Sequence, residues 1–179
     1  MLSKEGGMKK IVNPWIGMDG YSCFGCAPHN EAGVKMEFYE DGDDVVSVWH
    51  PEPKYQGWTH TLHGGIQATL LDEISAWTIA RKLQTTGVTS KMELRYLKPV
   101  HTTDEYLVIR GTIAERKRNI VTVDACIYDQ AGEPCTKASC TYFTFSKEKA
   151  LNELHFSGCE VEKEDVNPLE GNPKEYNVH

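Results

Sequence analysis

The sequence lacks the features that place a protein in or across a membrane. Its 179 residues contain no apolar run approaching the roughly 18 residues that a transmembrane helix needs. The N-terminal segment MLSKEGGMKK has no apolar core of the kind found in secretory signals. We therefore expect a cytoplasmic location and no membrane partner. The 6 cysteines are expected to be free, because a cytoplasmic protein of this size needs no disulfide bonds.

Signature motifs of several enzyme classes are also missing. There is no G-x-S-x-G nucleophile elbow, no Walker phosphate loop and no G-x-G-x-x-G fingerprint. Serine hydrolase, nucleoside triphosphatase and dinucleotide-dependent activities are therefore poorly supported. An excess of basic residues is missing as well: the formal net charge is −7 at pH 7, which argues against nucleic acid as a partner.

A complete metal-ligating motif is absent too. Cys23 and Cys26 form the only C-x-x-C pair, and His29 follows three residues later. A complete zinc site needs a fourth ligand, and no second C-x-x-C or H-x-x-x-H supplies it. We therefore predict no metal and interpret the C-x-x-C pair as part of a packed N-terminal flap.

Positive charge, although scarce overall, gathers in one part of the chain. Residues 91–118 contain seven Lys or Arg against four Asp or Glu, whereas residues 146–179 contain four lysines against eight acids. A locally basic stretch on an acidic chain suits a compact phosphorylated ligand better than a polymer, with scattered surface charge as the alternative. Arg116, Lys117 and Arg118 lie at an expected hairpin turn and are the candidate phosphate contacts.

The chain divides into an irregular start, one folded domain and a polar end. Residues 1–30 contain too many prolines and glycines for regular structure. Residues 31–146 show the alternation of strands and the period of one helix. Residues 147–179 have weak periodicity and are expected to form a partly mobile tail. Strands are predicted over residues 34–38, 45–49, 89–97, 106–114, 120–128 and 135–145, with a turn at Gly42 between the first two.

The segment GGIQATLLDEISAWTIARKL, residues 64–83, is predicted to form one helix that ends near residues 85–87, where Gly87 can supply the cap. It is apolar on nearly all of its faces, which indicates a helix buried nearly all round. Two strands, this helix and then antiparallel strands leave no βαβ alternation, which argues against a parallel doubly wound sheet. The order predicts an α+β protein in which a curved antiparallel sheet wraps around one central helix, the architecture called a hotdog.

Two glycines open the helix directly after His63. Gly64 and Gly65 let another group approach the first backbone N–H groups, which have no intrahelical acceptors. Those donors, with the positive end of the helix dipole, can polarise a carbonyl oxygen. Tight packing of the loop-to-helix turn is the alternative use of the glycine pair.

Asp72 and Glu73 are the only charges between His63 and Arg81, on a helix otherwise built of apolar and small residues. A desolvated carboxylate is costly unless it has partners or a task. We expect Asp72 to be the working group and Glu73 to lie in a solvated stripe. Asp72 is roughly 13 Å along the axis from His63, so a site containing both requires two antiparallel helices in a homo-oligomer, a dimer or a dimer of dimers.

Three segments carry a family resemblance. HGGIQATLLDE, with the aspartate nine positions after the histidine, resembles the active-site helix of the PaaI-type hotdog acyl-CoA thioesterases. The sequence Gly87-Val88-Thr89 is similar to the start of the strand that follows this helix in the family. CFGCAPHNEAG resembles an N-terminal element of the same proteins, and together the segments span about residues 23–146.

The resemblance implies a role for each matching residue. Asp72 corresponds to the acid that acts as general base or nucleophile toward the thioester. Gly65 corresponds to the backbone donor that holds the thioester carbonyl, and His63 to the histidine near that carbonyl. Thr89 corresponds to a Ser/Thr position that orients the attacking water.

The resemblance also implies a substrate-binding set, with one departure. Some relatives carry Asn six residues before the histidine, where this chain has Gly57, and the neighbouring Gln56 is expected to substitute. Gly64 and the basic residues 116–118 complete the expected contacts, the latter with the phosphates of coenzyme A.

A positioned carboxylate, a water and fixed N–H donors meet the needs of thioester hydrolysis without a cofactor. The sequence therefore predicts an enzyme that hydrolyses a small or medium acyl-CoA. An acyl-thioester dehydratase and a non-catalytic acyl-CoA-binding protein remain as alternatives. The acyl chain and the choice between base and nucleophile stay open.

Overall fold

The computed structural model describes residues 7–170 of the chain. The end of the expected tail, residues 171–179, lies outside the described residues, as do residues 1–6. The elements in chain order are β1 Met8–Ile11, β2 Tyr39–Asp41, β3 Asp44–Trp49, the 3-10 turn η1 Pro53–Tyr55, β4 Gln56–Trp58, β5 Thr61–Leu62, α1 Gly64–Leu83, β6 Gly87–Tyr96, β7 Leu107–Lys117, β8 Ile120–Tyr128, β9 Pro134–Thr144, α2 Lys147–Leu154 and β10 Val161–Val166.

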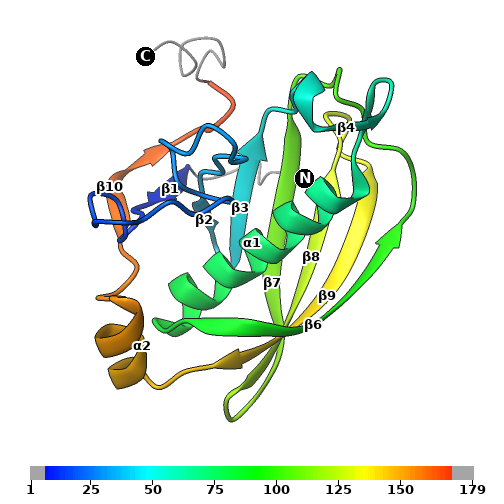
Figure 1. The fold of residues 1–179 in the computed structure, drawn as a ribbon. Coiled ribbons are helices and arrows are strands. Elements are labelled where there is room, and N and C mark those ends of the chain that lie inside the picture. Colours follow the sequence, from blue (N-terminus) through cyan, green and yellow to red (C-terminus); the bar gives the residue numbers. More distant parts are fainter. Residues whose placement is uncertain (1–6, 171–179) are drawn as a thin grey trace.

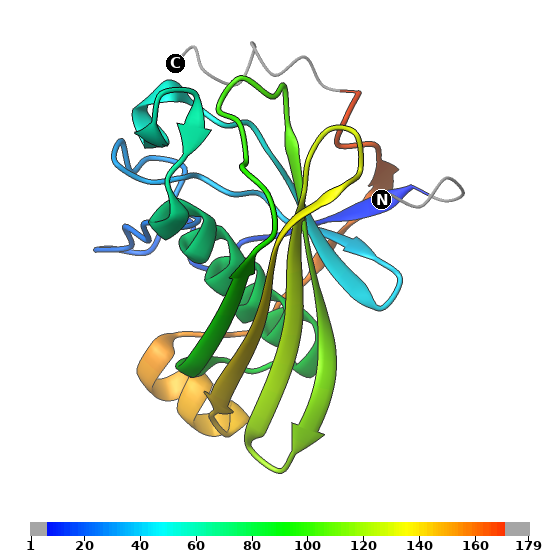
Figure 2. The same ribbon diagram turned by 90° about the vertical axis from the view of Figure 1, so that its right-hand side faces the viewer.

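The predicted architecture is confirmed: one long helix lies on one face of an antiparallel sheet (Figure 1). Eight strands follow the order β10-β1-β2-β3-β7-β8-β9-β6, and β4 and β5 form a separate two-stranded ribbon. The long strands β6 to β9 curve past α1, which runs diagonally across them (Figure 2). Strand β6 is the outermost strand of the sheet on one side.

Helix α1 spans the predicted residues and buries the side that meets the sheet. Leu70, Leu71 and Ile74 are fully buried, and each such side chain contributes about 1.5–3 kcal/mol by leaving water. The expected cap at Gly87 is wrong. Gln84 takes the left-handed conformation that closes α1, and Gly87 starts β6, where a Cβ would lie 2.6 Å from the carbonyl oxygen of Phe143.

Three elements lie where the sequence predicted irregular or mobile chain. β1 belongs to the segment 1–30, and α2 and β10 belong to the segment 147–179, yet both strands join the main sheet. β1 pairs with β10 on one side and β2 on the other, so that Lys9 is in register with Asp165 and with Glu40. Opposite charges across strands stabilise such a pairing, but the partners are far apart in sequence and local periodicity does not reveal them.

The strand predicted over residues 34–38 is also corrected. The sheet includes β2 only from Tyr39, because the preceding residues bond elsewhere. The backbone N–H of Val34 donates to the carbonyl of Phe24, and that of Met36 donates to the carbonyl of Gly25, each at 2.8 Å. The N-terminal segment is thus attached to the extended chain in front of β2. The predicted turn at Gly42, with a φ of 59°, is confirmed.

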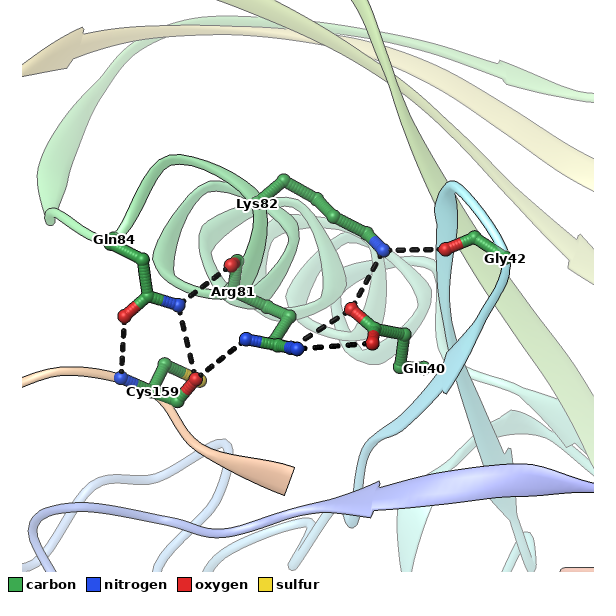
Figure 3. A network of polar contacts seen from close by, with 6 residues as sticks. All are labelled: Glu40, Gly42, Arg81, Lys82, Gln84 and Cys159. Carbon is green, nitrogen blue, oxygen red and sulfur yellow. Dashed lines mark hydrogen bonds and ion pairs between the residues drawn. The ribbon is translucent and has the colours of Figure 1, made fainter. Parts of the chain in front are cut away.

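A polar network joins the last turn of α1 to strand β2 and to Cys159, which lies shortly before β10 (Figure 3). The carboxylate of Glu40, on β2, accepts from Arg81 Nη2 at 3.0 Å and from Lys82 Nζ at 2.8 Å. Arg81 Nη1 and Gln84 Nε2 donate to the carbonyl of Cys159, each at 3.0 Å. Burial alone would raise the pKa of Glu40, but the hydrogen bonds from Lys82 and Arg81 outweigh it and hold the pKa below its usual range.

We predict that Glu40→Gln lowers the free energy of unfolding at neutral pH by about 1–3 kcal/mol, because two cations lose a charged acceptor. Since the folded-state pKa of Glu40 lies below the unfolded value, its contribution is complete above a pH of about 4.3 and is lost as the pH falls through the folded-state pKa. Denaturant unfolding at a series of pH values measures this.

The matched control is Glu93→Gln, which removes an ion pair to Lys91 whose side chains are 63% and 69% exposed. We expect this variant to change the free energy of unfolding by less than about 0.5 kcal/mol. Equal losses in the two variants would contradict the stabilising role of the Glu40 network.

Candidate active site

Asp72 lies in the third turn of α1, half-buried and facing β6 and β9. Its Oδ1 atom accepts from Thr89 Oγ1 at 2.7 Å and from Tyr142 Oη at 2.5 Å. The Tyr142 hydroxyl is also 2.8 Å from the Asp72 backbone carbonyl. No group within residues 7–170 donates to Oδ2, so one oxygen is fixed and the other is available to a water or a substrate. Asp72 and Thr89, which the resemblance gave separate roles, are therefore in direct hydrogen-bond contact.

Tyr142 is the residue at this site that sequence reasoning missed. It is 1% exposed, and burial, followed by the charge of Asp72, raises the pKa of its hydroxyl far above the usual range. The phenol is therefore a neutral donor to the carboxylate throughout the ordinary pH range. Thr89 and Tyr142 are register partners of β6 and β9. The alternation of strand β9 places Tyr142 inward, but no pattern in the sequence says that it meets Asp72.

The second part of the predicted site lies at the beginning of α1. His63 precedes the first turn, and its Nδ1 accepts from the backbone N–H of Gly65 at 2.9 Å. The donor that was expected to hold a substrate carbonyl is therefore engaged by the imidazole. Because Nδ1 is an acceptor, the neutral ring carries its proton on Nε2. Gly64 is held from the other side, because its carbonyl accepts from Tyr96 Oη at 3.0 Å.

An open depression of about 480 Å³ surrounds this helix start. Its lining includes Phe24, Gln56, His63, Gly65 and Ile66, so Gln56 and His63 line the same depression. At residue 57, where some relatives carry Asn, a Cβ would lie 3.2 Å from His63 Cδ2. The glycine there leaves room for the imidazole in its observed position.

The structure does not bring the two groups together within one chain. His63 and Gly65 are at the start of α1, whereas Asp72 is more than two turns further along, roughly 13 Å at the rise of an α-helix. Asp72 does not line the depression around His63. Each chain thus carries the two halves of the predicted site, His63 with Gly65 and Asp72 with Thr89, at separate places.

The basic residues 116–118 lie at the turn between β7 and β8, and all three are exposed. Strand register aligns Thr89, Tyr142, Val121 and Arg116 in one row across β6, β9, β8 and β7. Neighbouring strands are about 4.8 Å apart, so Arg116 is three strands, or about 14 Å, from Thr89. The basic turn therefore belongs to the end of the sheet that holds Asp72, not to the end near His63.

The prediction that Glu73 lies in a solvated stripe is wrong. Glu73 Oε1 accepts from the indole Nε1 of Trp77 at 3.1 Å and from Cys23 Sγ at 3.5 Å. It faces the N-terminal segment, which covers this side of α1. Periodicity could not indicate this, because the segment that covers Glu73 is irregular and far away in sequence.

The described part of the chain contains no helix that is long and apolar enough to span a membrane. The family model of the thioesterase superfamily matches residues 59–136, which include His63, Asp72 and Thr89 but not Tyr142. A curated relative, an uncharacterized protein of Schizosaccharomyces pombe, is 25% identical over 135 residues, which make up 72% of this chain and 77% of the relative.

Solved structures share the fold. A hypothetical thioesterase protein from Streptococcus pneumoniae, determined with coenzyme A, is 28% identical with a TM-score of 0.58, over 62% of this chain and 86% of that chain. Variants of that protein with an aspartate or a threonine replaced by alanine also match. A Streptococcus mutans protein bound to acetyl-CoA is 22% identical with a TM-score of 0.59, over 73% of this chain and 98% of that chain.

The hotdog arrangement of sheet and helix is thus shared with these solved structures, and the family model of the thioesterase superfamily matches the part of the chain that contains α1 and the strands after it.

Proposed function

We propose that this protein is a PaaI-type thioesterase that hydrolyses a small or medium acyl-CoA to the free acid and coenzyme A. The observation that carries the proposal is the Asp72 carboxylate, which Thr89 and Tyr142 hold by one oxygen while the other has no donor within residues 7–170. A carboxylate with one fixed and one available oxygen is suited to a general base or a nucleophile.

The relatives support the choice of substrate. The Streptococcus pneumoniae protein was determined with coenzyme A and the Streptococcus mutans protein with acetyl-CoA. The residue types replaced in variants of the former, one aspartate and one threonine, are those of the pair Asp72 and Thr89. A ligand of this class carries phosphates, which the exposed basic turn at residues 116–118 can bind.

Hydrolysis by general base catalysis starts with a water next to Asp72. The free oxygen Oδ2 takes a proton from this water as the water oxygen attacks the thioester carbon. The carbonyl oxygen becomes an oxyanion, the C–S bond breaks, and the coenzyme A sulfur leaves and recovers the proton. In the nucleophilic variant Oδ2 itself attacks, coenzyme A leaves, and water then cleaves the resulting anhydride.

The oxyanion needs donors that Asp72 does not supply. The N–H of Gly65 and the positive end of α1 meet this need, and the carbonyl oxygen of the substrate would replace His63 Nδ1 as the acceptor of that N–H. The Nε2–H of the displaced imidazole provides a further donor nearby.

The two halves meet if two copies of the chain associate with their α1 helices antiparallel. His63 and Gly65 of one copy then lie opposite Asp72 of the other, and a dimer contains two equivalent sites. The outer strand β6 supports this association, because Val88, Tyr96 and Leu97 on or just after it are more than half exposed. Apolar side chains on an unpaired edge strand favour contact with another chain.

We predict that Asp72→Asn keeps the fold and lowers kcat for acyl-CoA hydrolysis by at least about a hundredfold, because the amide is neither a base nor a nucleophile. Release of the coenzyme A thiol from a panel of aliphatic and aromatic acyl-CoAs measures this. Asp124→Asn changes an exposed carboxylate on β8 and is expected to retain activity. Wild-type turnover by Asp72→Asn would contradict the proposal, and the absence of turnover from a folded wild type would favour an acyl-CoA-binding protein.

For the basic turn, we predict that the double variant Arg116→Glu, Arg118→Glu raises KM for acyl-CoA about tenfold or more, because two phosphate contacts become repulsive. An acyl-pantetheine thioester, which lacks the nucleotide, is the matched substrate and its KM is expected to stay unchanged. If KM for acyl-CoA is unaffected, the turn does not bind the nucleotide.

A further inference from the structure

Outside the Asp72 site, a second group of reactive side chains gathers on α1. The Sγ atoms of Cys23 and Cys26 and a carboxylate oxygen of Glu73 all lie within 4.8 Å of one another. The two thiols come from the C-x-x-C turn of the N-terminal segment, and the carboxylate comes from the helix. Glu73 therefore adds a third side chain of a metal-ligating type. The sequence alone did not associate it with the C-x-x-C pair.

Backbone hydrogen bonds fix the C-x-x-C turn, and the glycine at residue 25 lets it lie close to Glu73. The N–H of Ala27 donates to the carbonyl of Cys23 at 3.1 Å, and the carbonyls of Phe24 and Gly25 accept from the chain at residues 34 and 36. A Cβ at Gly25 would lie 2.3 Å from Glu73 Cδ. Only glycine at this position allows the carboxylate to approach the two thiols.

We propose that Cys23, Cys26 and Glu73 bind one Zn²⁺ ion, which joins the N-terminal segment to α1. Thiolates favour zinc over magnesium or calcium, and zinc accepts a carboxylate oxygen beside them. With Zn–S distances of about 2.3 Å and Zn–O distances of about 2.0–2.2 Å, the two sulfurs and the carboxylate oxygen of a tetrahedral site lie about 3.5–3.8 Å apart. The observed cluster reaches this spacing by small side-chain movements.

A water completes the four ligands. His29 does not serve as the fourth, because its Nε2 is 2.7 Å from the carbonyl of Tyr21 on the exposed side of the segment.

Hydrogen bonds from neighbouring side chains orient the ligand atoms of the cluster. Trp77 Nε1 donates to Glu73 Oε1 at 3.1 Å. The hydroxyl of Tyr21 is 3.0 Å from Cys26 Sγ and accepts from Asn13 Nδ2 at 2.8 Å, so it is placed to donate to Cys26 once that sulfur is a thiolate. Donors of this kind fix the orientation of metal ligands and stabilise their negative charge. No Lys or Arg within residues 7–170 forms an ion pair with Glu73, and a divalent cation provides the missing positive charge.

The position of the cluster connects the metal to the active site. Phe24, between the two cysteines, lines the depression that contains His63 and Gly65. Neighbouring helical residues point about 100° apart, so Asp72 faces the sheet while Glu73 faces the C-x-x-C turn. The zinc ion therefore positions a wall of the substrate site and takes no part in the reaction at Asp72.

Metal content tests the inference without assuming any hydrolase activity. The full chain is purified with a reducing agent, incubated with Zn²⁺, freed of excess metal and analysed by mass spectrometry for zinc per chain. We expect one equivalent for wild type, and cobalt in its place should give the absorption band of thiolate-to-cobalt charge transfer. Cys126→Ala and Glu93→Gln, which change a cysteine and a glutamate outside the cluster, should keep the metal.

Two variants of the cluster make the test decisive. Cys23→Ser is expected to lose the metal and the cobalt band, and Glu73→Gln, which retains the size of the side chain, is expected to weaken zinc binding at least about tenfold. Circular dichroism confirms that each variant is folded. The inference is overturned by a wild type that binds no zinc, whether its thiols are free or joined in a Cys23–Cys26 disulfide, or by metal that persists in Cys23→Ser.

Discussion

Helix α1 can lie as close to the sheet as it does because residue 111 has no side chain. A Cβ on Gly111, in β7, would lie 2.6 Å from Thr78 Oγ1 and 3.3 Å from the carbonyl oxygen of Ile74. At this separation the Tyr142 hydroxyl of β9 and the Thr89 hydroxyl of β6 both reach Asp72 on the helix. A helix displaced outward by a side chain at position 111 would lose these hydrogen bonds first. The spacing between helix and sheet is thus a requirement of the site as well as of the core.

The same helix presents different chemistry on each of its sides. Its first turn carries the N–H donors, its sheet-facing side carries Asp72, and its other side carries Glu73 against the C-x-x-C turn. Its last turn donates hydrogen bonds from Arg81 and Lys82 to Glu40, at the end of the helix opposite to His63 and Gly65. The rigid helix therefore sets the distances among all the groups on which the proposals depend.

The helix and the long strands could be predicted from the sequence. Most of the elements and contacts that could not be predicted depend on partners far away in the chain. Residues 64–83 form one long run of apolar and small residues that is too long for a strand, and the long strands β6 to β9 alternate and follow one another in sequence, so their existence followed from local patterns. The four residues of β1 and the charged strand β10 pair only with distant chain and have no such pattern. The contacts of Tyr142 and Glu73 were missed for the same reason, because each depends on a partner from another element. The engagement of the Gly65 N–H by His63 depends on a side-chain rotation, which no residue pattern encodes.

In the proposed mechanism each active site is built from residues of two chains. Co-expression of His63→Ala and Asp72→Asn with different affinity tags allows the mixed dimer to be isolated. In this dimer one site contains both substitutions and the other contains neither. Because Asp72→Asn removes the base or nucleophile and His63→Ala removes the imidazole donor near the oxyanion, we expect about half of the wild-type hydrolysis rate per dimer, well above the rate of either parent dimer. A mixed dimer as inactive as its parents, or a wild type that stays monomeric, would show instead that the two halves of the site do not meet between chains.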